Sequence, residues 1–207
     1  MTNSSIHVST EQIKALRDRT GAGVIECKKA LIEAGGNPEE AVRILREKGK
    51  TIAAQKAGRA AHEGLIGSYV HSGRIGVLVE VNCETDFVAK TDQFKSFVQE
   101  VCLQVASMNP RYVNREEVPH EQISRTLEQL HEEIQGVDEE GAQPIQQSHM
   151  EQFYRERVLL DQPYVRDTSK SIQDLLTDTI SSLRENIVIR RFSRFALGED
   201  FEVKEAV

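Results

Sequence analysis

The stretch VNCETDFVAK, Val81–Lys90, joins two strongly patterned segments of the chain. Before it, apolar side chains recur at every second position from Ile75 to Cys83, and this period of two predicts a β-strand with one buried face. After it, apolar side chains recur three and four positions apart over 91–108, which predicts an amphipathic helix ending before Pro110. The stretch is therefore a corner between a strand and a helix, and such a corner presents its side chains from a rigid support.

Asp86 and Phe87 lie at the tip of this corner, and two interpretations of them are open. In the first, Phe87 packs in the core beneath the corner and Asp86 caps the following helix. In the second, both side chains are exposed and contact a partner. The chemistry of the two residues is compatible with either interpretation.

The first sixty residues predict a small module of three helices. Ser9 and Gln12 have the spacing of a capping box, which begins the first helix, and the glycines of TGAG, Thr20–Gly23, end it. Two adjacent glycines end the second helix, and the Asn-Pro pair at 37–38 begins the third. We expect the third helix to end near Gly49.

Four parts are expected along the chain. They are the three-helix module at 1–50, an alanine-rich helical linker at 51–63, an α+β core at 64–198 and a tail at 199–207. In the core, a hairpin that turns at Ser72-Gly73 and the closing strand NIVIRRFSRFAL at 186–197 predict an antiparallel sheet with helices packed on it. A looser segment containing Gly136, Gly141 and Pro144 is expected between two of the core helices.

The charge of the chain is acidic and unevenly distributed. There are 33 acidic and 26 basic side chains, which gives a net charge of −7. Nine of the acidic residues fall within 116–140, where Arg125 is the only lysine or arginine. An acidic surface repels phosphate backbones, so we expect no direct nucleic acid binding.

The compartment is inferred from apolar runs and cysteine usage. No apolar run approaches the roughly 18 residues that a membrane helix needs, so we expect no membrane contact. The first residues, MTNSSIHVSTEQ, have neither the basic flank nor the apolar stretch of a secretory signal, so a cytoplasmic chain is expected. The three cysteines are widely spaced in apolar stripes, which favours buried thiols over disulfides or metal ligands.

Catalytic motifs were not found in the sequence. It has no phosphate loop, no nucleophile elbow, no His-Glu-x-x-His and no Cys-x-x-Cys. Its six histidines are scattered on polar or loop segments. We therefore expect a protein that is not an enzyme, has no cofactor, metal site or catalytic residue, and acts by binding another protein.

Three runs of the sequence carry a resemblance to a known family. They are LRDRTGAGVIECKKAL at Leu16–Leu31, VEVNCETDFVAK at Val79–Lys90 and ENIVIRRFSRF at Glu185–Phe195. In these runs, and in their order and spacing, the chain closely resembles elongation factor Ts, the bacterial guanine nucleotide exchange factor for elongation factor Tu. The resemblance implies that the chain promotes GDP release from elongation factor Tu during translation elongation.

The resemblance also implies a docking role for the N-terminal module. This module looks like the ubiquitin-associated-like domain with which the family docks on the GTPase domain of its partner. The positions that match its contacts are Arg17, Val24 and Ile25. Residues 24 and 25 depart from the family, which often has methionines there, but both remain apolar. The alternative is that the pair packs inside the three-helix core. The periodicity of a helix would allow one of these two adjacent side chains to point into that core.

The corner matches the segment of the family that enters the partner. The matching positions are Thr85, Asp86, Phe87 and Val88. In the family, the acid and the aromatic enter near the magnesium ion of the bound nucleotide and push adjacent elements of the partner apart. The chain also resembles the short form of the family, which is understood to work as a dimer. Because the closing strand is apolar on parts of both faces, we expect a homodimer here.

Two rival functions belong to other classes. A ubiquitin-binding or peptide-binding adaptor would use the N-terminal module, and its activity would not need the core. An RNA-binding protein would use the arginines of the closing strand, Arg190, Arg191 and Arg194. A salt titration separates RNA binding from a protein interface, because phosphate contacts give the steeper dependence.

Overall fold

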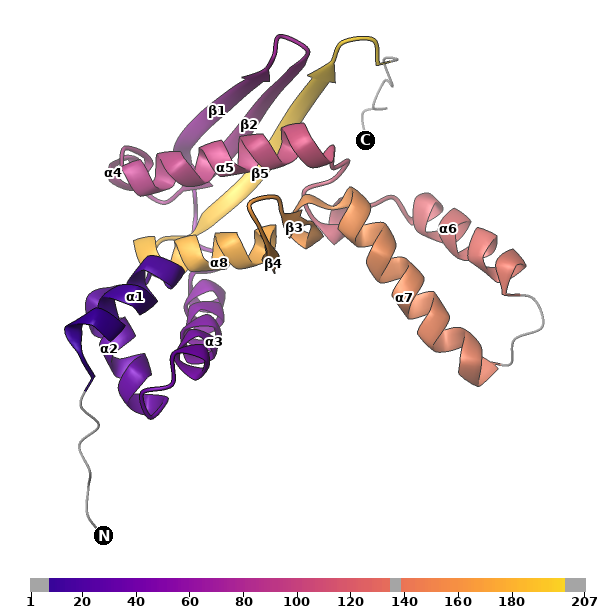
Figure 1. Cartoon of the computed structure of the whole chain (residues 1–207). Coiled ribbons are helices and arrows are strands. Elements are labelled where there is room, and N and C mark those ends of the chain that lie inside the picture. Colours follow the sequence, from indigo (N-terminus) through magenta and orange to yellow (C-terminus); the bar gives the residue numbers. More distant parts are fainter. Residues whose placement is uncertain (1–7, 135–138, 200–207) are drawn as a thin grey trace. The chain divides into compact units, whose positions relative to one another are not determined.

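The computed structural model in Figure 1 describes residues 8–134 and 139–199, which form two compact units. Unit 1 contains residues 8–64, 82–97 and 174–188. Unit 2 contains residues 65–81, 98–134, 139–173 and 189–199. Most of the expected tail, and Gly136 of the expected looser segment, lie outside the described residues. Within the described ranges, every helix is too short or too polar to span a membrane.

Unit 1 begins with the three helices that the sequence predicts. They are α1 (Thr10–Thr20), α2 (Val24–Glu33) and α3 (Pro38–Lys56). Ser9 and Gln12 make both hydrogen bonds of the capping box, and Gly21 ends α1 in the left-handed conformation with φ 68°. The buried core of the three helices consists of Leu16, Cys27, Ala30, Leu31 and Ala41. The predicted three-helix module is therefore confirmed.

The expected end of the third helix near Gly49 is wrong. Helix α3 continues to Lys56, so the first part of the helical linker is an extension of α3. A Cβ atom at Gly49 would lie 3.6 Å from Cβ of Ser181 and 3.7 Å from Cγ2 of Thr177, both on α8 (Ile172–Leu183). Gly49 is buried at this contact with α8, and the tertiary packing compensates for the low helix propensity of glycine.

The three-stranded sheet has the order β1-β2-β5. Its strands are β1 (Glu63–His71), β2 (Ile75–Cys83) and β5 (Ile187–Ala196). The hairpin turns at Ser72 (φ 49°) and Gly73 (φ 66°), and the amide of Arg74 donates to the carbonyl of His71 at 2.9 Å. The face of β2 that is buried consists of Val77, Val79, Val81 and Cys83. The fold is the predicted α+β class, with a small antiparallel sheet and packed helices.

Helix α5 (Asp92–Met108) packs closely on β1 in unit 2, at Gly67. A Cβ atom at Gly67 would lie 2.4 Å from Cγ1 of Val98 and 2.9 Å from Sγ of Cys102. These distances are shorter than van der Waals contact, so a side chain at this position would push α5 away from the strand. The sequence pattern identifies the strand but does not reveal this contact.

We expect Gly67→Ala to destabilise the fold by about 1–3 kcal/mol, the usual cost of overpacking a core. Gly76→Ala is the matched control, because a Cβ atom at Gly76 on β2 would meet nothing within 4 Å. Urea denaturation followed by circular dichroism measures both variants. Equal denaturation midpoints for the two variants would contradict the tight contact between β1 and α5.

The three cysteines are free and buried, as the sequence predicts. Burial raises the pKa of the Cys102 thiol to about 11. Burial, together with the charge of Glu185, raises the pKa of the Cys83 thiol to about 11. At neutral pH these thiols are protonated and behave as small apolar side chains.

Two short strands in unit 2 were not predicted. They are β3 (Pro163–Tyr164) and β4 (Asp167–Ser171), which pair antiparallel. A fully buried pair of glutamines holds this hairpin on α5. Nε2 of Gln104 donates to Oε1 of Gln162 at 3.1 Å, and the amide of Val165 donates to Oε1 of Gln104 at 3.0 Å. Because the hairpin depends on these long-range polar contacts, its own residues give no strand pattern.

The expected looser segment before residue 152 is largely helical. Helix α6 (His120–Glu133) is followed by α7 (Glu139–Arg157), and α7 includes both Gly141 and Pro144. Ile123 of α6 packs on a core formed by Val118, Phe153 and Val158. The proline lies close to the start of α7, where it removes a single helical hydrogen bond, and packing between the two helices offsets that loss.

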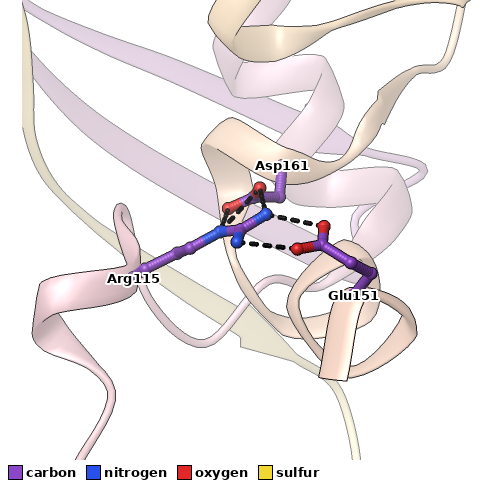
Figure 2. A network of polar contacts seen from close by, with 3 residues as sticks. All are labelled: Arg115, Glu151 and Asp161. Carbon is purple, nitrogen blue, oxygen red and sulfur yellow. Dashed lines mark hydrogen bonds and ion pairs between the residues drawn. The ribbon is translucent and has the colours of Figure 1, made fainter. Parts of the chain in front are cut away.

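An arginine connects separate pieces of this region in unit 2. Figure 2 shows Arg115, on the short helix η1 (Arg115–Glu117), between the carboxylates of Glu151 and Asp161. Its guanidinium donates to Glu151 at 2.8 Å and to Asp161 at 3.0 Å, and it lies 4.3 Å from the ring centre of Tyr154. The two carboxylates raise the pKa of Arg115 above its usual range. The arginine thus ties the C-terminal half of α7 to the segment before β3.

Candidate partner-binding surfaces

The corner is built on a short helix, α4 (Asp86–Ala89). Thr85 is its N-cap, because the Thr85 Oγ1 atom accepts a hydrogen bond from the amide of Val88 at 3.3 Å. Ala89 is the buried residue of α4 and anchors it to the interior. The next helix, α5, has its own cap, since Oγ1 of Thr91 accepts from the amide of Phe94 at 3.2 Å.

The first interpretation of the corner, with Phe87 in the core and Asp86 as a cap, is wrong. The side chain of Phe87 is 79% exposed, and its ring lies 6.0 Å from the ammonium group of Lys90. Asp86 forms an ion pair with Lys90, and this hydrogen bond lowers the pKa of the Asp86 carboxyl. An aromatic ring this exposed makes no contribution to core packing, so the corner is free to contact a partner through it.

Sequence reasoning missed the residues that hold the corner in place. The carboxylate of Glu185, which lies just before β5, accepts hydrogen bonds from the amides of Glu84 and Thr85 at 3.1 and 3.0 Å. The carboxylate of Glu84 accepts from the amide of Asn186 at 2.6 Å, and this bond lowers the pKa of Glu84. The available signal was that both acids lie within the runs that carry the family resemblance, and it does not reveal contacts across 100 residues.

The positions expected to dock, on the N-terminal module, are also exposed. Val24 and Ile25 form the first turn of α2, and they are 52% and 68% exposed. The alternative that the pair packs inside the three-helix core is wrong, because both side chains are exposed and the buried face of α2 begins at Cys27. Arg17 is exposed on α1, and its carbonyl accepts the capping bond from Gly21. The module therefore presents an apolar pair beside a short glycine-containing turn.

Two arginines of the closing strand have acidic partners. Arg191 donates to Glu80 at 2.7 Å. Arg194 forms an ion pair with Glu199 at 2.6 Å, and its side chain is 11% exposed. These charges are already balanced within unit 2, which weakens the RNA-binding alternative.

A comparison with known proteins decides the family. The family model described as "Elongation factor TS" matches residues 9–199. The chain belongs to the elongation factor Ts family. The protein named elongation factor Ts of Thermoanaerobacter sp. (strain X514) is 54% identical over 198 residues, which are 94% of this chain and 97% of that protein.

Proteins named elongation factor Ts from other organisms also match nearly the whole chain. Elongation factor Ts of Coprothermobacter proteolyticus is 52% identical over 197 residues, covering 94% of this chain and all of that protein. Elongation factor Ts of Carboxydothermus hydrogenoformans is 48% identical over 201 residues, covering 96% of this chain and 93% of that protein. As a member of the elongation factor Ts family, the chain is a translation elongation factor and takes part in protein biosynthesis.

Proposed function

We propose that this elongation factor Ts homologue is the guanine nucleotide exchange factor for elongation factor Tu. It acts in the cytoplasm by protein binding, without catalytic residues or a cofactor of its own. The observation that carries the proposal is Phe87, a large ring that is 79% exposed on a capped and hydrogen-bonded corner. Moving one such side chain from water into a partner stabilises a complex by about 2–3 kcal/mol.

The proposed mechanism is a competition between the corner and the nucleotide. Asp86 and Phe87 enter elongation factor Tu near the magnesium ion of bound GDP and displace the elements that hold it. The factor and the nucleotide then weaken each other's binding through one shared coupling free energy. A thousandfold loosening of GDP needs about 4 kcal/mol of coupling, which is more than one aromatic ring supplies.

Docking by the N-terminal module supplies further binding energy. Val24 and Ile25 provide apolar area that is exposed in the free protein, and Arg17 adds a positive charge. We propose that these residues contact the GTPase domain of elongation factor Tu. Unit 1 contains both this module and the corner, so one unit carries the proposed docking and intruding residues.

The test of this function is the release of labelled GDP from elongation factor Tu with and without the chain. We expect release to accelerate with the concentration of the chain and then to saturate. The adaptor alternative predicts no acceleration, and instead predicts binding of ubiquitin or a peptide by the N-terminal module. A calorimetric binding titration of the chain with ubiquitin, run beside the GDP-release assay, separates the two functions.

We also propose that the chain is a homodimer, paired through the outer face of the sheet. This face carries large apolar side chains from all three strands in unit 2. They are Ile66 (71% exposed), Val70 (68%), Leu78 (52%) and Phe195 (61%). The opposite face of the sheet is the one covered by α5. A second copy related by a two-fold axis would cover the apolar face with an identical one.

Light scattering at micromolar concentration is expected to give twice the 23.3 kDa mass of the chain. Leu78→Glu is expected to shift the population to the monomer, because it places a charge at the centre of the proposed interface. Ile32→Glu, a substitution of the same type at an exposed apolar residue of α2, is the control and is expected to leave the mass unchanged. A parent protein that remains monomeric after tenfold concentration would contradict the dimer.

A further inference from the structure

We propose that Glu185 is a positioning residue for exchange, because its carboxylate fixes the backbone from which Asp86 and Phe87 project. The inference rests on the proposed exchange function and adds to it a residue that lies outside the corner. Glu185 lies between α8 and β5, about 100 residues further along the chain. Both pieces belong to unit 1.

The two oxygens of the Glu185 carboxylate accept different hydrogen bonds. Oε2 accepts hydrogen bonds from the amides of Glu84 and Thr85, at 3.1 and 3.0 Å. Oε1 accepts the hydroxyl hydrogen of Thr85 at 2.6 Å. Hydrogen bonds to an ionised carboxylate are stronger than neutral ones, so this group holds the start of α4 more firmly than a backbone turn would.

The bond to the Thr85 hydroxyl controls the cap of α4. A threonine hydroxyl has one hydrogen to donate, and here it is directed to Glu185. The lone pairs of the same oxygen therefore remain available to accept from the amide of Val88 at 3.3 Å. Because α4 has only four residues, this cap is a large part of what stabilises it. Glu185 thus sets the orientation of the short helix that carries Phe87.

A second set of hydrogen bonds is donated by the segment that contains Glu185 and accepted by the corner and by the segment after α3. The amide of Asn186 donates to Oε1 of Glu84 at 2.6 Å, and Nδ2 of Asn186 donates to the carbonyl of Arg59 at 2.7 Å. The guanidinium of Arg59 lies 3.5 Å from the carboxylate of Glu84. Glu185 therefore accepts backbone hydrogen bonds from the corner, and Glu84 of the corner accepts one from Asn186. Arg59, in the segment after α3, belongs to the same network.

The position of Phe87 depends on this network because the ring itself is poorly held. It is 79% exposed, and the Lys90 ammonium near its face is also exposed. Only the backbone of α4 therefore determines where the ring points. A corner without Glu185 would still dock but would enter the partner less often in the productive orientation, so the maximal rate would fall while docking stays intact.

The test measures GDP release from elongation factor Tu over a concentration series of each variant. Glu185→Ala is expected to lower the saturating release rate about tenfold or more, with the half-saturating concentration unchanged within about twofold. Glu185→Gln is expected to restore most of the rate, because its amide oxygen accepts both backbone hydrogens and its NH₂ group donates to Thr85 Oγ1. Glu33→Ala, which removes an exposed acid paired with Lys48 on the same unit, is the control.

A second variant keeps the test valid if Glu185→Ala does not fold. Thr85→Val replaces only the hydroxyl, leaves both backbone bonds to Glu185, and is expected to lower the saturating rate. Hydrogen exchange at the amide of Val88 should quicken in Thr85→Val and in Glu185→Ala, which a loss of docking alone would not cause.

The outcomes distinguish this inference from the proposed function. If the parent accelerates release and Glu185→Ala matches it, or raises only the half-saturating concentration, the positioning role is overturned. If the parent itself does not accelerate release, the exchange function fails, and the role of Glu185 in it fails for that separate reason.

Discussion

Stimulated GDP release is expected to fall about thirtyfold or more in the Phe87→Ala variant, which loses the 2–3 kcal/mol that a buried aromatic ring contributes to the complex. The free energy of unfolding should remain that of the parent, because the ring is 79% exposed and packs against no core residue. Asp86→Ala should act in the same direction with a smaller effect. Stopped-flow measurement of labelled GDP release at saturating factor tests both variants.

Phe87→Leu is the matched control for this prediction. It keeps an apolar side chain at the tip of the corner, so it should retain more activity than the alanine variant. Parent-like exchange by Phe87→Ala would contradict the intruding role. A loss of about 3–5 kcal/mol in stability would contradict the exposed position, since that is the cost of removing a core aromatic.

Complex formation is expected to weaken about a hundredfold or more in the double variant Val24→Asp and Ile25→Asp. Each apolar side chain contributes about 1.5–3 kcal/mol when it is buried in an interface, and each aspartate adds an unpaired charge. The release rate at saturating factor should change much less, because the corner is untouched. Calorimetric titration of elongation factor Tu, compared with saturating exchange, measures the two effects separately.

Ile32→Asp supplies the control for the docking surface, since Ile32 is also an exposed apolar residue of α2, at 43%, but lies near the opposite end of the helix. It should bind more tightly than the double variant. Equal losses in binding and in saturating exchange, together with unfolding of the three helices, would mean that residues 24 and 25 support the core rather than the partner.

The elements that could be predicted are those whose pattern is local. The period-two strand before the corner, the Ser72-Gly73 turn and the apolar stripe of α5 each arise from residues within one element. The capping box at Ser9 and Gln12 is a contact between neighbours in sequence. Such features do not depend on the rest of the fold, so the sequence is sufficient to place them.

The elements that were wrong or missed depend on distant partners. The sequence pattern predicts a helix end near Gly49, yet α3 continues through it because the glycine packs against α8. Pro144 was expected in a looser segment between helices, yet α7 includes it. The hydrogen bonds of Glu185 to Thr85 join residues far apart in sequence, and no periodicity marks them. The residues alone left the exposure of Phe87 open, because burial at a corner depends on what packs beneath it, and only the family resemblance favoured an exposed ring.

The central claim is that GDP and this factor weaken each other's binding to elongation factor Tu. The most direct measurement is the dissociation constant of the parent chain for nucleotide-free elongation factor Tu, compared with that for elongation factor Tu saturated with GDP. Reciprocal coupling of about 4 kcal/mol predicts a difference on the order of a thousandfold, with the nucleotide-free form bound more tightly. Equal dissociation constants for the two forms would contradict the exchange function, however tightly the chain binds.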